Sequence, residues 1–301
     1  MYDIGIIGGG TAGMTAAIYG QRAGKKTVIL EAESFGGQIV VSHKVENYPG
    51  IASISGAEFS MNLMNQAKDL GAVTKSVQAT KIRKEGNHMV IETTADPVVC
   101  RTVIIATGVA HRHLGVPKEN EMVGAGVSYC ATCDGAFFRN LDVAVIGGGN
   151  TALQDAAFLS NYCKKVYLVH RRDEFRGEKN LVDMLKTREN VEFVLSATVK
   201  EIVGEDYVEG LILNDLKTAG TKELKVDGLF VAIGQIPKND MFGDVVKLDG
   251  DGFILAAEDC ITSCPGVFVA GDCRSKEVRQ LTTAAADGAV AALAACSYID
   301  R

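Results

Sequence analysis

The sequence lacks the features that mark membrane, secreted and nucleic-acid-binding proteins. It contains no run of about twenty uncharged apolar residues, the length that a helix needs to cross a bilayer. Its first residues, Met1-Tyr2-Asp3, lead directly into an apolar run and lack the basic segment of a secretory signal. The net charge of -6 disfavours a nucleic-acid surface, and the one basic cluster, His170 to Arg176, is long enough for a single phosphate. We therefore expect a cytoplasmic protein.

Cysteine is scarce and irregularly placed. Eight cysteines in 301 residues do not resemble the dense pattern of a small secreted disulfide scaffold. Most of them, including Cys100, Cys163 and Cys296, are expected to be small buried side chains. A chain of this length can form two hydrophobic cores, and its 47% hydrophobic and 23% charged composition is that of a globular protein.

A glycine-rich motif, Gly8-Gly9-Gly10-Thr11-Ala12-Gly13, lies between an apolar run at residues 3 to 7 and a predicted helix at 11 to 23. Glycines at this spacing let the backbone approach a pyrophosphate, which the N-terminus of the following helix stabilises. Glu31 ends the next predicted strand, about twenty residues further on, where a carboxylate accepts hydrogen bonds from ribose hydroxyls. The alternative interpretation is a tight turn with a solvated glutamate.

A second motif, Gly147-Gly148-Gly149-Asn150-Thr151-Ala152, repeats the plan between a predicted strand at 143 to 146 and a helix at 151 to 161. Here the next strand ends in His170-Arg171-Arg172, with Arg176 one turn later. Guanidinium groups suit a phosphate, which a carboxylate would repel. The contrast with Glu31 predicts a ligand with a 2′-phosphate, NADPH in preference to NADH, although a solvated basic helix start is the alternative.

The repeat extends to whole modules, since each glycine motif is followed by a β-rich stretch that ends in a strand, at 103 to 108 and at 229 to 234. A further strand at 267 to 272 precedes an alanine-rich helix at about 280 to 298. If this tail packs on the first module, the second is an insertion within it. We expect an α/β fold of two three-layer, Rossmann-like dinucleotide-binding domains, the first at residues 1–113 and 244–301 and the inserted one at 114–243.

The motif Cys130-Ala131-Thr132-Cys133 precedes the second glycine turn. Two intervening residues let the sulfurs close a ring, and such pairs commonly contain a thiol of lowered pKa. Zinc would need a second pair, and Cys260 and Cys264 have the wrong spacing. Redox use is favoured, with metal binding and chance as alternatives. Asp134 follows directly and is placed to deliver protons, unless it is a helix cap or a solvent-facing side chain.

Taken in order, these motifs resemble those of the low-molecular-weight, bacterial-type thioredoxin reductases, over essentially the whole length. The matching blocks are Gly36-Gly37-Gln38, Val45-Glu46-Asn47-Tyr48-Pro49-Gly50, Ala106-Thr107-Gly108, Cys130-Ala131-Thr132-Cys133-Asp134-Gly135, His170-Arg171-Arg172 with Arg176, Gly271-Asp272 and Arg279-Gln280.

The resemblance implies FAD along the first domain, with Glu31 on the adenosine ribose, Asp272 on the ribitol, and Arg279 and Gln280 over the flavin ring. It implies NADPH on the inserted domain. The residues expected to bind cofactors are Gly8, Gly10, Thr11, Ala12, Gly13, Glu31, Gly36, Gly37, Gln38, Asn47, Thr107, Gly108, Gly271, Asp272, Arg279 and Gln280 for FAD, and Gly147, Gly149, Asn150, Thr151, His170, Arg171, Arg172 and Arg176 for NADPH.

The implied reaction is electron transfer from NADPH through FAD to the dithiol and on to thioredoxin. In the family pattern, Cys133 faces the flavin, Cys130 exchanges with thioredoxin, and Asp134 donates the proton. A homodimer is expected on the same ground. The alternatives are a glutaredoxin-like or peroxiredoxin partner, including the flavoprotein arm of alkyl hydroperoxide reductase, whose extra N-terminal redox domain we do not expect here, and a non-catalytic flavin redox sensor.

The expected domain arrangement raises a mechanical requirement. The dithiol and the NADPH site lie in the same inserted domain, yet both must reach one flavin. We therefore expect this domain to rotate between two docked states, as the family does, about hinges near residues 114 to 116 and 237 to 240.

Overall fold

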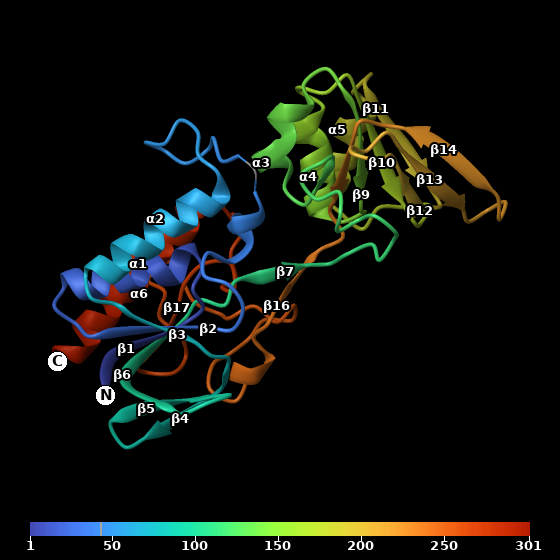
Figure 1. Ribbon diagram of the computed structural model, residues 1–301. Coiled ribbons are helices and arrows are strands. Elements are labelled where there is room, and N and C mark those ends of the chain that lie inside the picture. The colour runs from blue at the N-terminus through green and yellow to red at the C-terminus, as the bar shows by residue number, and fades with distance from the viewer. Residues whose placement is uncertain (43) are drawn as a thin grey trace. The chain divides into compact units, whose positions relative to one another are not determined.

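The computed structural model describes residues 1–42 and 44–301 and divides into two compact units (Figure 1). Unit 1 comprises Met1–Ala110 and Ile236–Arg301, and unit 2 comprises His111–Gln235. Unit 2 is thus inserted in the sequence of unit 1.

The unit boundaries differ by a few residues from the expected ones at 113/114 and 243/244. The segment after Ile236 belongs to unit 1 because Phe242 is fully buried there, in one cluster with Val246 and Ile254. Asn239, also fully buried, donates hydrogen bonds to the carbonyl oxygens of Gly252 and Cys273. The expected hinge at 237 to 240 therefore includes Asn239, which these hydrogen bonds hold in the core of unit 1.

The sheet of unit 1 has β1 at its centre, flanked in parallel by β2 and β6. The first part of β6 pairs with the β4–β5 hairpin, and its last residues pair in parallel with β17. Because β17 belongs to the C-terminal segment, the tail completes the sheet of this unit. The strands are β1 (Tyr2–Ile7), β2 (Thr27–Glu31), β3 (Val73–Ser76), β4 (Ala79–Glu85), β5 (His88–Thr93), β6 (Val98–Ile105) and β17 (Val267–Val269).

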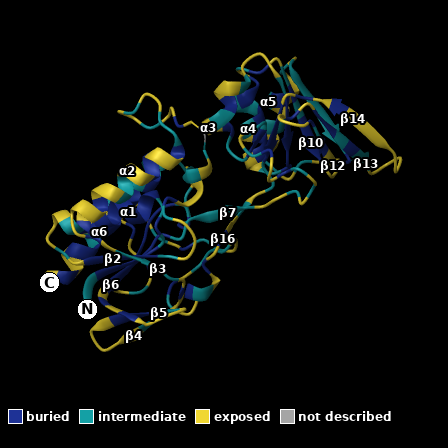
Figure 2. Ribbon diagram, viewed as in Figure 1, coloured by how far each residue is buried: buried dark blue, intermediate teal, exposed yellow. Residues whose placement is uncertain are grey.

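Three helices, α1 (Thr11–Arg22), α2 (Gly56–Asp69) and α6 (Leu281–Ile299), pack together beside this sheet (Figure 1). The backbones of α1 and α6 nearly touch, since a Cβ atom on Gly288 would lie 2.3 Å from the Ala12 carbonyl oxygen. Small residues on α6 make this approach possible. Of the described helices, α6 alone is long and apolar enough to cross a membrane, but much of it is buried against its neighbours, as in a core helix (Figure 2). The short 3-10 helices of unit 1 are η1 (Gly37–Val41) and η3 (Asp240–Phe242).

Unit 2 repeats the plan. Its parallel sheet has the order β11-β10-β9-β15-β8, which matches β3-β2-β1-β6-β17 of unit 1 position by position. An antiparallel sheet, β12-β13-β14, follows in the position of the β4–β5 hairpin along the chain. The elements are β8 (Val127–Ser128), α3 (Ala131–Asp134), η2 (Gly135–Phe138), β9 (Asp142–Ile146), α4 (Asn150–Leu159), β10 (Lys165–His170), α5 (Lys179–Lys186), β11 (Val191–Leu195), β12 (Ala197–Val203), β13 (Gly210–Asp215), β14 (Thr221–Lys225) and β15 (Gly228–Val231).

The two chain crossings between the units pair with each other as β7 (Val109–His111) and β16 (Gln235–Pro237). The expected hinge at 114 to 116 follows the crossing strand β7, which ends at His111. The backbone there is held within unit 2, because the buried Glu119 carboxylate accepts hydrogen bonds from the N–H groups of Leu114 and Gly115, both at 2.8 Å. The rotation itself stays a prediction.

Candidate cofactor and dithiol sites

The first glycine turn brings the end of β1, the end of β6 and the start of α1 into backbone contact. A Cβ atom on Gly8 would lie 2.2 Å from the Ala106 carbonyl oxygen, and one on Gly13 would lie 1.9 Å from the Gly8 oxygen. Gly10 faces more open space, with its nearest neighbour at 3.9 Å. Gly8 and Gly13 therefore permit close contact between backbone segments, whereas Gly10 leaves room for a ligand to approach the backbone.

The N-terminus of α1 is suited to an anion. Gly10 is its N-cap, and no side chain caps the first turn, so the N–H groups of Thr11, Ala12 and Gly13 are not satisfied by a cap. Glu31 lies beside the same turn, and its two oxygens accept hydrogen bonds from Gly9 N at 2.6 Å and Glu33 N at 2.8 Å. Each oxygen keeps acceptor capacity for a hydroxyl group. This donor set fits the pyrophosphate and ribose of a dinucleotide.

The segment after β2 closes over this turn. Gly36 donates from its N–H to the Gly9 oxygen at 2.8 Å, and both Gly36 and Gly37 have positive φ, at 115° and 66°. The amide of Gln38 donates to the Val109 oxygen, and Asn47 donates to the Gln280 side-chain oxygen at 3.2 Å. The structure thus brings segments more than 200 residues apart in the chain to one edge of unit 1.

The ends of β6 and β17 supply the remaining predicted residues. Thr107 donates its hydroxyl to Asn239 at 3.2 Å, and a Cβ atom on Gly108 would find no atom within 4 Å. The buried Oδ1 atom of Asp272 has no hydrogen-bond partner among the described residues. Burial raises the pKa of this carboxyl, while Lys276 and Arg279 oppose the rise. An orphaned buried acceptor of this kind fits a ligand hydroxyl.

Arg279 is held beside Asp272. Its Nε atom donates to the Asp272 backbone oxygen at 3.3 Å, and its guanidinium lies 4.3 Å from the centroid of the Phe253 ring. Gln280 forms a capping box with Thr283 at the start of α6. Neither Phe253 nor Asn239 is identified by the sequence analysis, because no motif marks the loop that presents each of them.

The second glycine turn likewise contains one closely packed glycine and one open glycine. A Cβ atom on Gly147 would lie 2.4 Å from the Ala232 oxygen and 2.6 Å from the Ala152 methyl carbon, whereas one on Gly149 would find nothing within 4 Å. Gly149 is the N-cap of α4, and no side chain caps that helix. Unit 2 therefore also presents an open helix N-terminus after its central strand.

A basic loop folds over this second turn. Arg176 donates its backbone N–H to the Gly148 oxygen at 2.8 Å. The side chain of Asn150 accepts from Glu178 N at 2.7 Å and donates to the Glu178 carboxylate at 3.1 Å, which fixes the loop to α4 beside the exposed Thr151. The guanidinium groups of Arg171, Arg172 and Arg176 are exposed, and within the described residues no ion pair involves them.

His170 has a different position from the expected one. It is buried, its ring stacks on Phe175, and a Cβ atom on Gly148 would lie 2.1 Å from it. Burial lowers the pKa of His170, and the three neighbouring arginines lower it further. The imidazole lies beneath the glycine turn and supports Gly148 by packing, whereas the arginines lie on the exposed side. Phosphate binding by His170 stays a prediction.

The predicted redox pair forms a disulfide. Cys130 and Cys133 are joined, with their Cα atoms 5.3 Å apart. Cys130 caps the four-residue helix α3 through its backbone oxygen, which accepts from Cys133 N at 3.2 Å and Asp134 N at 3.1 Å. Cys133 is exposed and Cys130 is half-buried. The two-residue spacing closes the ring within one helical turn, as the sequence predicts.

Asp134 is held by a buried serine that the sequence analysis missed. The hydroxyl of Ser128 donates to Asp134 Oδ2 at 2.6 Å and accepts from Cys130 N at 3.0 Å. Asp134 makes no side-chain cap to the 3-10 helix that it precedes. The carboxylate is thus half-buried and fixed to the dithiol turn, which disfavours the solvent-facing and helix-cap alternatives.

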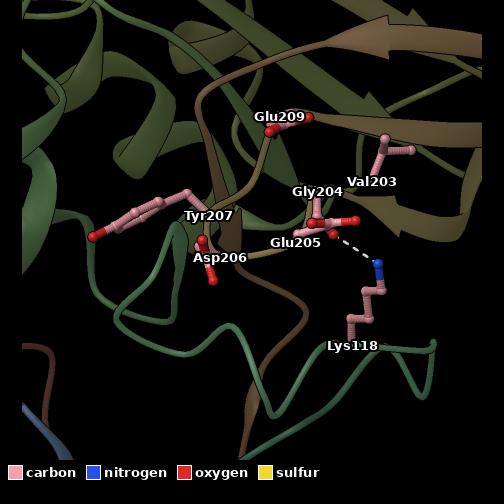
Figure 3. Close-up of a pocket in the computed structure, with 7 residues that line it drawn as sticks. All are labelled: Lys118, Val203, Gly204, Glu205, Asp206, Tyr207 and Glu209. Carbon is pink, nitrogen blue, oxygen red and sulfur yellow. Dashed lines mark hydrogen bonds between the residues drawn. The ribbon is translucent and has the colours of Figure 1, made fainter.

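A cavity of about 490 Å³ elsewhere in unit 2 contains none of the predicted residues (Figure 3). Its lining includes Glu205, Asp206 and Glu209, and Lys118 donates to the Gly204 oxygen at 2.6 Å across it. Its acidic lining differs from the open helix N-termini of the two glycine turns.

Comparisons with known proteins agree with this geometry. Residues 2–288 match the family described as pyridine nucleotide-disulphide oxidoreductase. The chain is 40% identical to a thioredoxin reductase of Peptoclostridium acidaminophilum, over all of this chain and 98% of that protein. It is 41% identical to a thioredoxin reductase of Treponema pallidum, over 99% of this chain and 97% of that protein. The crystal structure of the Streptococcus pyogenes thioredoxin reductase has a TM-score of 0.96 at 40% identity, covering 100% and 98% of the two chains. These matches confirm the expected fold class.

Five of the six cysteines outside the disulfide are buried, and Cys264 is half-buried. Burial raises the pKa of Cys100 to about 12, of Cys163 to about 11 and of Cys260 to about 12, and Cys273 and Cys296 are buried as well. At pH 8 these thiols are protonated and shielded, so a maleimide should label only Cys264 rapidly in the native oxidised protein. Intact-mass spectrometry would show one adduct before unfolding and six after it. Rapid labelling of several native thiols would contradict this account of the core.

Proposed function

This chain belongs to the pyridine nucleotide-disulphide oxidoreductases, among which it is a thioredoxin reductase, and we propose that Cys130 and Cys133 carry its electrons to the disulfide of a thioredoxin. It is a flavoprotein disulfide reductase that uses FAD and NADPH. We assign FAD to unit 1 and NADPH to unit 2, with the residues predicted for each. The observation that carries the proposal is the pairing of a closed Cys130–Cys133 disulfide with two glycine turns whose neighbouring charges are opposite.

The charges beside the two turns support the assignment of cofactors. Glu31 beside the first turn accepts hydroxyl groups and repels an added phosphate, so it suits the adenosine of FAD. Arg171, Arg172 and Arg176 beside the second turn suit the 2′-phosphate of NADPH. When bound, FAD supplies a two-electron carrier that links the hydride of NADPH to the disulfide.

In the proposed cycle, the Cys130–Cys133 bond breaks as the pair takes up two electrons. The Cys130 thiolate attacks the partner's disulfide, which forms a mixed disulfide and releases one partner thiolate. Cys133 then attacks the Cys130 sulfur, restores the internal disulfide and releases the second partner thiolate. Asp134, held by Ser128, holds the proton exchanged with the dithiol. One NADPH and one proton are consumed for each partner disulfide reduced.

The direct test is a coupled assay in which NADPH oxidation requires catalytic thioredoxin and a disulfide reporter. The wild type should turn over, and Cys133→Ser should reduce the rate to background, because the second thiol is needed to release the partner. Cys264→Ser, which changes a half-buried thiol outside the disulfide, should retain the wild-type rate. If the wild type fails to reduce any thioredoxin-like protein, the result would favour a flavin redox sensor. If it reduces a glutaredoxin-like protein but no thioredoxin, the partner would be glutaredoxin-like.

A second test concerns the choice of NADPH. Hydrogen bonds to charged groups contribute about 1.5–3 kcal/mol, so Arg172→Ala or Arg176→Ala should raise the KM for NADPH roughly 10- to 100-fold. The KM for NADH should change little, since NADH lacks the 2′-phosphate. Arg188→Ala is the matched control, because its guanidinium donates to Asn161 at 3.0 Å, away from the basic loop. Equal losses with both nucleotides would contradict the assignment.

We also propose a homodimer in the cytoplasm. Val290, Leu293 and Tyr298 on α6 are 38%, 51% and 39% exposed, and exposed apolar side chains on one element favour an interface. Six cysteines remain thiols, which suits a reducing compartment. Sedimentation equilibrium should give about twice the 31.9 kDa mass of the chain, and a monomer at micromolar concentration would contradict the dimer.

A further inference from the structure

A buried cluster of charges lies directly behind the turn that follows β17. Its members are Arg274, Lys276 and Asp287, whose side chains are only 3%, 6% and 8% exposed. Arg274 and Lys276 follow Gly271-Asp272 in the chain, whereas Asp287 lies in the apolar helix α6. Buried charges are costly unless they are paired, so this cluster requires a structural or functional reason.

Asp287 is the centre of the cluster. Its Oδ2 atom accepts from Gly271 N at 3.1 Å, from Lys276 Nζ at 3.1 Å and from Arg274 Nε at 3.2 Å. Its Oδ1 atom accepts from Arg274 NH2 at 3.1 Å. Arg274 also donates to the backbone oxygens of Ala256 and Ala257, both at 3.3 Å. One carboxylate thus ties the Gly271 turn, two cations and a neighbouring loop to α6.

Lys276 is shared between two carboxylates. Its ammonium lies 3.1 Å from Asp287 Oδ2 and 3.6 Å from Asp272 Oδ1. The nearer contact is a hydrogen bond, whereas the Asp272 oxygen has no hydrogen-bond partner among the described residues. Asp287 thus takes the hydrogen bond from Lys276, and Asp272 Oδ1 keeps a longer ion pair and its capacity to accept a hydrogen bond.

We propose that Asp287 is a positioning residue for flavin binding: it holds Lys276 and the Gly271 turn so that Asp272 stays free to accept a hydrogen bond from a hydroxyl group on the flavin-bearing half of FAD. This inference rests on the proposed function, which assigns FAD to unit 1. It adds a residue from α6 that belongs to none of the motifs by which the cofactor sites are predicted.

The charge of Asp287 is what the proposal requires. In Asp287→Asn the shape is kept, but the buried ammonium of Lys276 loses the nearer of its two anionic partners. Asp272 is the next carboxylate within 4 Å of it, so Lys276 should turn to Asp272 and occupy the acceptor that FAD needs. Removing the ammonium as well, in Asp287→Asn with Lys276→Met, should leave Asp272 available again.

The test is titration of the deflavinated full-length protein with FAD and, separately, with ADP, for the wild type and four variants. ADP carries the adenosine half of FAD and would bind the first glycine turn and Glu31. Among the described residues, no hydrogen bond or ion pair joins Asp287 to that turn or to Glu31. Asp287→Asn should raise the Kd for FAD roughly tenfold or more, the scale of one hydrogen bond to a charged group, and leave the Kd for ADP within about threefold. The double variant should recover FAD affinity to within about threefold of Lys276→Met alone.

Asp300→Asn is the matched control, because it removes an exposed carboxylate, paired with Lys25, at the far end of α6. Its affinities for FAD and ADP should equal those of the wild type. A wild type that does not bind FAD would refute the proposed function, whereas a wild type that binds FAD and an Asp287→Asn variant of equal affinity would refute only this inference.

Two further results would overturn the inference. Parallel losses of FAD and ADP affinity would make Asp287 a purely structural residue, and a loss of FAD affinity that Lys276→Met does not repair would refute competition for Asp272. If Asp287→Asn does not fold, the double variant decides, because it contains no unpaired ammonium. It should fold and bind FAD within about threefold of Lys276→Met, and folding without FAD binding would overturn the proposal.

Discussion

Backbone-to-backbone contact at two glycine turns is the constraint from which the rest of the molecule follows. At Gly8 and Gly147 the end of a central strand lies so close to a neighbouring carbonyl oxygen that a side chain would overlap it. A Cβ atom would lie only 2.2 Å from that oxygen at Gly8 and 2.4 Å from it at Gly147. This contact fixes each following helix with its N-terminus at the edge of the sheet. The open positions, Gly10 and Gly149, then leave the turn accessible to a large anion.

In the assignment proposed above, the charges around each glycine turn select its ligand. Unit 1 has a carboxylate at the end of the second strand and an orphaned Asp272 oxygen at the end of another, both acceptors for hydroxyl groups. Unit 2 has exposed guanidinium groups in the corresponding place. We therefore propose that side chains outside the glycine motifs distinguish hydroxyl-rich FAD from the phosphate-bearing NADPH. The Cys130–Cys133 disulfide lies in unit 2 as well, and in the proposed cycle it passes the electrons on to the partner's disulfide.

The sequence predicts those features that are encoded locally. The glycine turns, Glu31, the arginines and the Cys130–Cys133 pair each occupy a short motif, and the repeated module and its insertion follow from the order of the motifs. Contacts between distant segments have no such signal. Asn239 and Phe242, which move the unit boundary, are buried by residues elsewhere in the chain, and so is His170, whose imidazole supports Gly148. Asp287 leaves a partial signal, since a carboxylate in an alanine-rich helix is unusual, but its partners emerge only from the fold.

The most direct test of the account is a crystal structure of the protein with FAD and NADP⁺ bound together. We expect the FAD pyrophosphate at the N-terminus of α1 and the 2′-phosphate of NADP⁺ within hydrogen-bond distance of Arg171, Arg172 or Arg176. A flavin dinucleotide on the Gly147–Ala152 turn, or a 2′-phosphate bound away from these arginines, would contradict it.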